Sequence, residues 1–470
     1  MLPPSARPLA WALHEALAPH WAALDRAAPQ GLASSPIAAL PAYHAASVPP
    51  DLKPGRAELI VEASDLPALR AALRCGADAV VIDFDDTFAP TPANLQAAYG
   101  ALPEVLNAAV PLLARPRALY ALEPAVTQGG QPARAALCDL AALLTARPGR
   151  VPHLYLPKLE TRAQARAWAA ALSAAETHLG LPGGSLRVCL QIETLPGLLV
   201  ADELLFDLRR WAFGLNAGRW DYVFSLVKST GAGRAAPIPP RSALGMDVDA
   251  MQAYAQALVQ VCRARGAQAV GGTAAVAPDP AAPQAALDAV RADKRREAAQ
   301  GFAGAWAGRP DLLDAVRAGL AQGGPGSPGA APVTPQRLLN LPDPGPLDPR
   351  EVADTAALAL DVFQAWFAGR GVVTRAGRIE DTATAELARA LLWQWVRVQA
   401  PLAGGDRLDR AAYLTLRRTL RPDDAPEAAL LDHLVLSAAA PAYFPREAQR
   451  LALTPRLTSP AERTLHDPES

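Results

Sequence analysis

The stretch that decides the fold is ELIVEASDLPALRAALRCGADAVVIDFDDTFAP, residues 58–90. Its two ends, 58–63 and 79–84, are short apolar runs with the composition of buried strands. Between them, 65–74 has the apolar spacing of a helix. A strand, a helix and a second strand form the repeating unit of α/β folds, so this stretch predicts one such unit.

The same alternation continues along the chain. Six further β-type runs follow, at 111–115, 151–158, 186–193, 222–227, 268–272 and about 300–306. Segments with helical spacing, such as 162–179 and 248–265, separate most of them. Eight β-type runs with intervening helices over roughly 250 residues predict a (β/α)8 TIM barrel. A doubly wound sheet is the structural alternative, but the chain has no G-x-G-x-x-G or P-loop motif to support it.

Four regions follow from this pattern. Residues 1–56 are rich in Ala and Pro and contain one helical pattern, so we expect a short N-terminal helical and loop segment. The barrel is predicted over 57–322. The low-complexity stretch GGPGSPGAAPVTP, 323–335, is typical of a linker. The remainder, 336–470, is mostly helical in pattern and predicts a separate helical domain.

Composition excludes several classes of partner. The 470 residues carry a formal net charge of −1 without a basic stripe, so we expect no nucleic acid. No apolar run reaches the roughly 18 residues without charge that a membrane span needs. The four cysteines are widely spaced and form no C-x-x-C pair. This spacing, the lack of a signal pattern and a C-terminus unlike S-K-L predict a cytoplasmic protein.

Polar residues gather where the predicted strands end, which is where TIM barrels place their chemistry. These residues are Asp83, Asp85, Asp86, Arg115, Arg117, Lys158, Glu160, Glu193 and Trp306, with Asp221 near a predicted strand start. Taken singly, an acidic residue after a strand is usually a turn residue or a helix cap. Several on one rim, mixed with arginines, indicate a site. We interpret Lys158 and Glu160 as an ion pair on that rim.

Asp83 to Thr87 also fits D-x-D-x-T, the pattern of haloacid-dehalogenase-type phosphatases. That activity requires a later lysine and a further acidic pair in a Rossmann-like core. We find no such set downstream, so the phosphatase hypothesis is the weaker one.

A metal site in this chain is expected to use oxygen ligands. The seven histidines are scattered and none forms H-x-x-x-H. Carboxylates select hard ions such as Mg²⁺. The best candidates are Glu193 in CLQIETLPG and Asp221 in GLNAGRWDYVF, each beside glycine-rich backbone that a small ligand can approach closely.

The same segments resemble malate synthase. The resemblance covers about 45–400 and is carried by IETLPG (192–197), GLNAGRWDYVF (214–224), RGAQAVGGTAAVAP (265–278), ADKRREAAQGFAGAWAGRPDL (292–312) and RIEDTATAELARALLWQWV (378–396). VVIDFDDTFAP aligns with the family's DFEDS segment, and ARPRALYALEP with its R-x-R-G-x-H-L segment. The D-x-D-x-T match is then accidental.

The resemblance implies a barrel with a helical C-terminal plug over its mouth. It further implies that acetyl-CoA and glyoxylate condense with the help of Mg²⁺, and that malyl-CoA is hydrolysed to malate and CoA. Because a plugged barrel has no obvious exposed apolar face, we expect a monomer.

Each residue role follows from the same resemblance. Glu193 and Asp221 correspond to the magnesium ligands, Arg115 to the catalytic arginine and Asp381 to the catalytic base. The resemblance also implies that Asp83 and Asp85 lie near the water ligands of the metal. The residues it implies for substrate binding are Gly218, Arg219, Trp220 and Trp306.

The chain departs from the family pattern around these residues. Where the family has G-H-D-G-T-W, this chain has Phe302 and Ala303 in place of the His and the Asp. Where the family has His-Leu after the arginine pair, this chain has Tyr120-Ala121-Leu122. Two alternatives therefore stay open: a related acyl-CoA enzyme that acts on another 2-oxo acid, and a non-catalytic acyl-CoA-binding protein.

Overall fold

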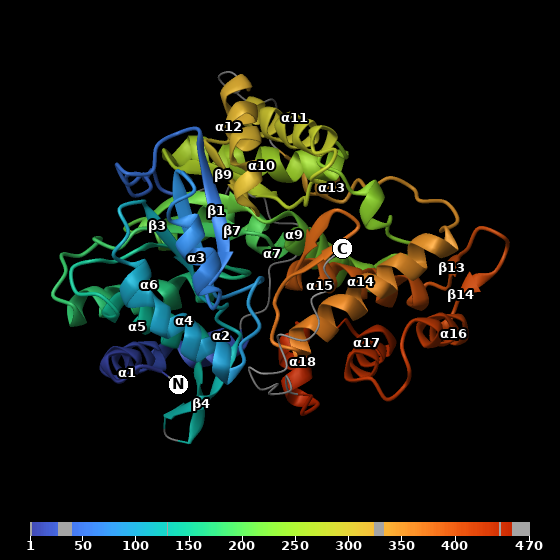
Figure 1. The fold of residues 1–470 in the computed structure, drawn as a ribbon, viewed down its shortest axis with the longest axis horizontal. Coiled ribbons are helices and arrows are strands. Elements are labelled where there is room, and N and C mark those ends of the chain that lie inside the picture. Colours follow the sequence, from blue (N-terminus) through green and yellow to red (C-terminus); the bar gives the residue numbers. More distant parts are fainter. Residues whose placement is uncertain (1, 27–39, 129, 324–332, 441–442, 454–470) are drawn as a thin grey trace.

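Eight parallel strands close into a barrel in the computed structural model, which describes residues 2–26, 40–128, 130–323, 333–440 and 443–453 (Figure 1). The strands follow one another around the barrel in the order β1-β10-β9-β8-β7-β6-β3-β2. They are β1 (Arg56–Glu62), β2 (Ala79–Asp83), β3 (Leu112–Arg115), β6 (His153–Leu156), β7 (Val188–Ile192), β8 (Ala212–Ala217), β9 (Gln268–Ala274) and β10 (Gly304–Ala307). The predicted TIM barrel is confirmed.

The outer layer consists of helices that follow the strands in sequence. They are α3 (Leu66–Ala72), α4 (Pro92–Val105), α5 (Ala135–Thr145), α6 (Arg162–His178), α7 (Leu195–Leu199), α8 (Ala201–Asp207), α9 (Arg219–Thr230), α10 (Asp249–Arg265), α11 (Gln284–Gln300) and α12 (Leu313–Gln322). Local signals set their ends. Thr161 and Gln164 form a capping box at the start of α6, and Gly266 ends α10 with a left-handed φ of 68°.

One predicted strand is wrong. The run 222–227 lies inside helix α9, and the strand is the preceding AFGLNA segment, β8. Both segments are buried over nearly their whole length. A short apolar run in a buried helix has no polar face, so its composition does not distinguish it from a buried strand. As a consequence, Asp221 lies in the first turn of a helix and not at a strand start.

The C-terminal helices cover one side of the barrel mouth. They are α14 (Pro349–Phe367), α15 (Thr382–Arg397), α16 (Arg410–Leu420), α17 (Pro426–Leu436) and α18 (Phe444–Arg450). In Figure 1 these orange and red helices lie beside the barrel, and α15 packs against α9, α14 and α17. The hairpin of β11 (Val373–Arg375) and β12 (Arg378–Glu380) leads directly into α15.

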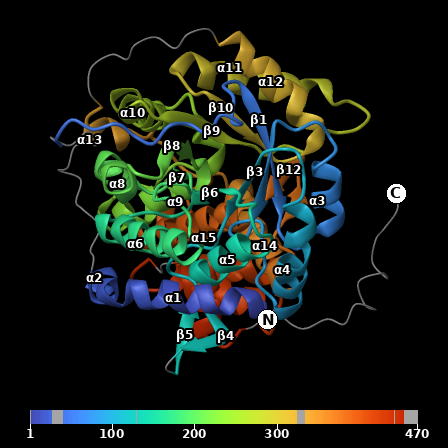
Figure 2. The ribbon, with the colours of Figure 1, turned by 90° about the vertical axis from the view of Figure 1, so that its left-hand side faces the viewer.

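The N-terminal segment forms α1 (Arg7–Leu17) and α2 (Trp21–Arg26). Figure 2 shows α1 crossing beneath α5 and α6, against which it packs. Shorter elements of the described part include the hairpins β4 (Leu122–Gln128) with β5 (Gln131–Arg134) and β13 (Ala400–Pro401) with β14 (Arg407–Leu408), and the helix α13 (Pro335–Leu338). Most of the expected linker, 324–332, lies outside the described residues.

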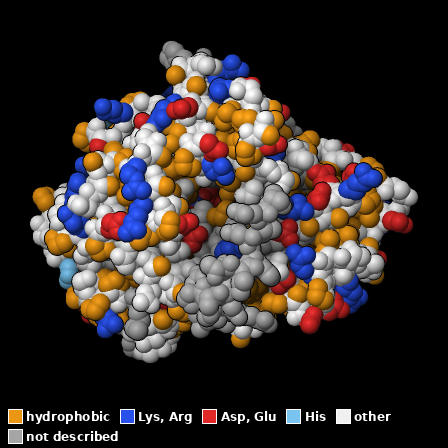
Figure 3. All heavy atoms as spheres, viewed as in Figure 1, with side chains coloured by type: hydrophobic (Ala, Val, Ile, Leu, Met, Phe, Trp, Pro, Cys, Tyr) orange, Lys and Arg blue, Asp and Glu red, His pale blue; other side chains and the backbone are white. Residues whose placement is uncertain are grey.

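Charge on the surface is mixed. On the face shown in Figure 3, Lys and Arg side chains are interspersed with Asp and Glu side chains. Among the described helices, none is both long and apolar enough to cross a membrane.

Candidate active site

A cavity of about 360 Å³ lies at the C-terminal ends of the barrel strands, where α9 and α15 meet the barrel. It is lined by eight of the ten residues predicted for the site: Arg115, Glu193, Gly218, Arg219, Trp220, Asp221, Trp306 and Asp381. The other two, Asp83 and Asp85, bind cationic side chains beside the cavity. The fold therefore brings together predicted residues that are up to about 300 positions apart in the chain, as expected for a barrel mouth.

Three buried carboxylates converge at this cavity. Asp86 follows β2, Glu193 follows β7 and Asp221 lies in the first turn of α9. Each offers one oxygen atom, and these atoms all lie within 4.8 Å of one another. Burial raises the pKa of Glu193 and that of Asp221. Burial acts in the same direction on Asp86, but Lys158 and Arg115 outweigh it and hold the pKa of Asp86 below its ordinary value.

Lys158 lies in the middle of these carboxylates. Its Nζ donates to Asp86 Oδ1 at 2.7 Å, to Asp85 Oδ2 at 2.8 Å and to Asp221 Oδ2 at 3.4 Å. Its backbone N–H donates to Glu193 Oε1 at 2.8 Å, in a left-handed conformation with φ of 53°. Such a conformation is costly for a residue with a side chain and is typical of functional sites. One residue thus orients four carboxylates.

The expected rim pair between Lys158 and Glu160 is wrong. Glu160 pairs instead with Lys228, at 2.8 Å. Lys158 is buried among the carboxylates of the barrel mouth, and its backbone has a left-handed conformation.

Arg115 is held by two aspartates from the 58–90 stretch. Its Nε and Nη2 donate to the two oxygens of Asp83, both at 2.6 Å, and its Nη1 donates to Asp86 at 2.8 Å. Thr87 also donates to Asp83 through its hydroxyl. A phosphatase would need Asp83 as a free nucleophile, whereas here both of its oxygens are bound to Arg115. The geometry gives the D-x-D-x-T match no phosphatase role.

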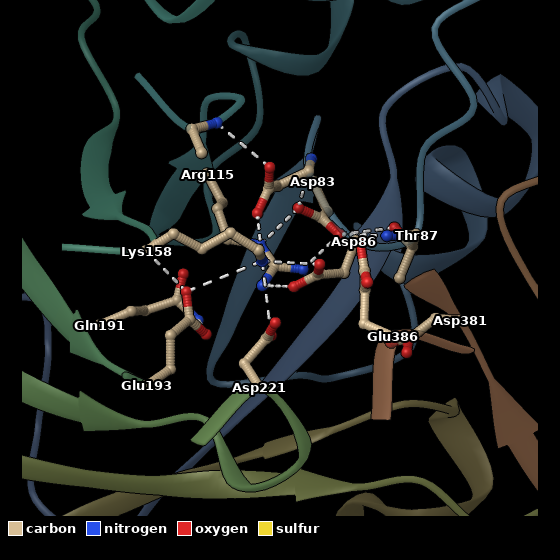
Figure 4. A network of polar contacts seen from close by, with 12 residues as sticks. Asp83, Asp86, Thr87, Arg115, Lys158, Gln191, Glu193, Asp221, Asp381 and Glu386 are labelled. Carbon is tan, nitrogen blue, oxygen red and sulfur yellow. Dashed lines mark hydrogen bonds and ion pairs between the residues drawn. The ribbon is translucent and has the colours of Figure 1, made fainter. Parts of the chain in front are cut away.

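These side chains form one ionic network, shown in Figure 4, which we call the mouth cluster. Its members are Asp83, Asp85, Asp86, Arg115, Lys158, Glu193 and Asp221. Five carboxyl groups face two cationic side chains, so full ionisation would leave an excess of negative charge in a buried place. An uncompensated buried charge is unfavourable, and a bound cation would offset it.

Unpaired oxygen atoms support the fit to a hard metal ion. Asp221 Oδ1, Gln191 Oε1 and Asn216 Oδ1 are buried and have no hydrogen-bond partner within the described residues. All three residues line the cavity. The donor set consists of oxygen atoms alone, which is what Mg²⁺ prefers.

A second buried network lies below the cavity, inside the barrel. In this inner cluster, Glu58 accepts hydrogen bonds from Arg56 Nε at 2.6 Å, Tyr155 Oη at 2.6 Å and Trp306 Nε1 at 3.1 Å. Trp306 connects the two networks, because the Arg115 guanidinium lies 5.4 Å from the centroid of its ring. The predicted substrate-binding residue is therefore also part of the barrel core.

Asp381 reaches the cavity from the plug. It follows β12 and is the N-cap of α15, where its Oδ1 accepts from the Thr384 N–H at 3.2 Å. The next residue, Thr382, donates its N–H to the backbone oxygen of Asp86 at 3.2 Å, which ties the helix start to the mouth cluster. Burial and the nearby Asp86 raise the pKa of Asp381 to about 7, although Thr384 and Arg115 act in the opposite direction. A carboxyl group of this pKa is suited to take a proton near neutral pH.

Helix α9 directs its N-terminus at the cavity. Gly218, its N-cap, is required because a Cβ there would lie 2.4 Å from Glu193 Oε2. The Gly218 N–H donates to the Tyr254 hydroxyl at 3.0 Å. The first turn of a helix also leaves N–H groups without intrahelical acceptors, and these attract anions. In α9 that turn contains Arg219 and Trp220, both of which line the cavity.

Sequence reasoning placed Asp86 and Lys158 on the rim but assigned neither of them to the metal site. Asp86 belongs to the same acidic run as Asp83 and Asp85, and its position three residues after Asp83 was the available signal. Lys158 gave a weaker signal, since only the backbone geometry reveals that its side chain points inward.

Comparisons with known proteins agree with this architecture. A family model described as "Malate synthase, TIM barrel domain" matches 111–322, and one described as "Malate synthase, C-terminal" matches 349–419. The malate synthase of Streptomyces clavuligerus is 34% identical over 413 residues, which cover 80% of this chain and 76% of that protein. The malate synthase of Oryza sativa subsp. japonica is 33% identical over 435 residues, which cover 84% of this chain and 76% of that protein.

Similarity to solved structures is weaker. A structure of CitE from Mycobacterium tuberculosis in complex with magnesium, acetoacetate and coenzyme A aligns with a TM-score of 0.39 and 19% identity. The alignment covers 73% of this chain and 98% of that chain. A likeness of this size carries no argument about the site.

Proposed function

Because this chain belongs to the malate synthase family, we propose that it condenses the acetyl group of acetyl-CoA with glyoxylate and hydrolyses the resulting malyl-CoA to malate and CoA. The observation that carries the proposal is the cavity at the barrel mouth. It brings a carboxyl group of raised pKa, an arginine and three convergent carboxylates together.

Glu193, Asp221 and Asp86 would hold one Mg²⁺, with Lys158 keeping the carboxylates in place. Their buried excess of negative charge and the unpaired Asp221 Oδ1 support this assignment. When bound, Mg²⁺ supplies Lewis-acid polarisation of the glyoxylate carbonyl.

Asp381 acts as the general base. It removes a proton from the acetyl methyl group, and its pKa of about 7 leaves it basic enough to do so at neutral pH. Its place at the start of α15 means that the plug, and not the barrel, delivers the base. Movement of the plug against the barrel would then exclude water before the proton is removed.

Arg115 stabilises the thioester enolate. Of its five N–H donors, Asp83 and Asp86 use three in the described structure, which leaves two for the enolate oxygen. The aspartates and the Trp306 ring hold the guanidinium in place, so little reorganisation is needed when charge develops.

The N-terminus of α9 binds the glyoxylate carboxylate. Since the Gly218 N–H already donates to Tyr254, this role falls to the N–H groups of Arg219 and Trp220. The first turn of α9 thus supplies both an anion site, from Arg219 and Trp220, and a carboxylate ligand for the metal, from Asp221.

The experiment that tests the proposal is release of free CoA thiol from acetyl-CoA. We expect release that requires glyoxylate, that stops when EDTA removes the metal, and that returns on addition of Mg²⁺. Folded protein that releases no thiol at saturating glyoxylate, or releases it equally in EDTA, would contradict the proposal. Parallel assays with other 2-oxo acids define the substrate, because Phe302 and Ala303 replace polar residues of the family pattern.

A further inference from the structure

One carboxyl group in the cavity has no role in the proposed condensation. Six acidic residues line the cavity, namely Glu62, Asp65, Asp86, Glu193, Asp221 and Asp381. Three of them form the metal trio and Asp381 is the base. Asp65 is occupied as the N-cap of α3, where its Oδ1 accepts from the Ala68 N–H at 2.9 Å. Glu62 remains.

Glu62 is the last residue of β1 and pairs in register with Asp83 of β2. Its strand end therefore lies beside the end of β2, whose Asp83 binds Arg115 from the next strand. Oε1 accepts a hydrogen bond from the Ser64 hydroxyl at 2.5 Å, which fixes the carboxyl group at the cavity wall. Within the described part of the chain, Glu62 has no ion-pair partner and its Oε2 has no hydrogen-bond donor.

The surroundings of Glu62 suit proton transfer. Burial, together with the like charges of Asp65 and Asp83, raises its pKa to about 7, against the opposing effect of the Ser64 hydrogen bond. A carboxyl group in this range exchanges protons readily at neutral pH. Unlike Asp381, it belongs to the barrel, so its position does not depend on the plug.

We propose that Glu62 is the general base for the second step, hydrolysis of the malyl-CoA thioester, which rests on the proposed function. Glu62 takes a proton from a water molecule while the oxygen of that water attacks the thioester carbonyl carbon. The carbon–sulfur bond then breaks, and the CoA thiolate takes the proton back from the Glu62 carboxyl group. The products are malate and CoA thiol, and Glu62 returns to its carboxylate form.

Two separate bases explain how one cavity performs two proton transfers. After C–C bond formation Asp381 carries the proton of the acetyl methyl group until it passes that proton to the new alkoxide of malyl-CoA, and a protonated carboxyl group does not accept a proton from water. Glu62 offers a second acceptor on a different wall of the same cavity. Condensation and hydrolysis are therefore expected to respond to different substitutions.

The test uses the full-length protein with Mg²⁺ and follows malyl-CoA and CoA thiol separately by chromatography. For Glu62→Gln we expect condensation within about threefold of wild type, accumulation of malyl-CoA, and hydrolysis of added malyl-CoA slowed at least a hundredfold, the lower end for loss of a general base. Asp65→Asn is the matched control, because it removes a carboxyl group from the same cavity wall and keeps a good helix cap. It is expected to release CoA without accumulating malyl-CoA.

Equal slowing of condensation and hydrolysis in Glu62→Gln, or hydrolysis at the wild-type rate, would overturn the proposal. If Glu62→Gln does not fold, Glu62→Asp keeps the carboxyl group, and we expect it to slow hydrolysis more than condensation. Wild-type protein that neither condenses nor hydrolyses would refute the proposed function. Wild-type protein that completes both steps, paired with a hydrolytically competent Glu62→Gln, would refute only the role of Glu62.

Discussion

The barrel contains two buried ionic clusters that differ in their balance of charge. In the inner cluster one carboxylate, Glu58, faces one guanidinium, Arg56, and both Glu58 oxygens accept hydrogen bonds. In the mouth cluster five carboxyl groups face two cations, and Asp221 keeps an oxygen without a partner. Both clusters are almost inaccessible to water, so burial does not distinguish them. Unbalanced charge and unused ligand atoms are the two features by which we propose the mouth cluster, and not the inner cluster, as the binding site.

The largest effect is expected from the base that faces the mouth cluster. Asp381→Asn keeps a good N-cap for α15 but cannot accept the methyl proton. We expect kcat to fall by about 10²–10⁴, the usual contribution of a general base, with an unchanged melting temperature. Steady-state CoA release measures kcat, and thermal unfolding measures the melting temperature. A variant with more than a tenth of wild-type kcat would remove Asp381 from the mechanism.

A pair of substitutions separates the two clusters directly. Asp221→Asn removes a proposed metal ligand, and we expect a loss of at least about a hundredfold in activity, because loss of even outer-shell partners of a metal costs about 10–100-fold. Glu58→Gln leaves Arg56 without its counter-charge, so we expect a loss of about 3–5 kcal/mol of stability while Mg²⁺ is still required.

Activity at fixed Mg²⁺ and urea unfolding provide the readouts for this pair. If the activity of both variants depended on added Mg²⁺ to the same extent, the inner cluster and the mouth cluster would not differ in metal binding as we propose.

Lys158 connects the charge of the mouth cluster to folding. Removing its ammonium group in Lys158→Met leaves buried carboxylates uncompensated, which we expect to cost about 3–5 kcal/mol in metal-free protein. Because Mg²⁺ supplies positive charge at the same place, the loss should be smaller with Mg²⁺ present. Urea unfolding with Mg²⁺ and with EDTA measures both. A loss that is the same in the two conditions would mean that Lys158 does not substitute for metal charge.

The smallest effect is a pH dependence. Asp381 works only in its charged form, and its pKa is raised to about 7, so kcat/KM should rise by about tenfold per pH unit below pH 7 and level off above it. The residual activity of Asp381→Asn should lack this rise. A wild-type profile that is flat between pH 5 and 7 would argue against Asp381 as the titrating base.

The sequence predicts the barrel, and the resemblance predicts eight of the residues that line the cavity, because both depend on local signals. Apolar runs, helix caps and the GLNAGRWDYVF segment carry their meaning in a few consecutive residues. The run 222–227 was misassigned because a helix buried on all sides lacks the polar face that reveals its period.

Other features depend on geometry that no short segment contains. Lys158 enters the mouth cluster through a left-handed backbone, and Asp86 joins Glu193 only when β2 and β7 take their places in the barrel. The free oxygen of Glu62 likewise becomes visible only once its neighbours are placed. The role of a buried charged residue is decided by its partners, and the partners are set by the tertiary fold.

We propose that the excess charge of the mouth cluster holds a divalent cation. Calorimetric titration of Mg²⁺ into EDTA-treated protein tests it most directly, with wild type, Asp221→Asn and Glu58→Gln compared side by side. We predict one Mg²⁺ per chain for wild type and for Glu58→Gln, and no measurable binding for Asp221→Asn. Wild-type protein that binds no Mg²⁺, or an Asp221→Asn variant that binds it as wild type does, would contradict the account.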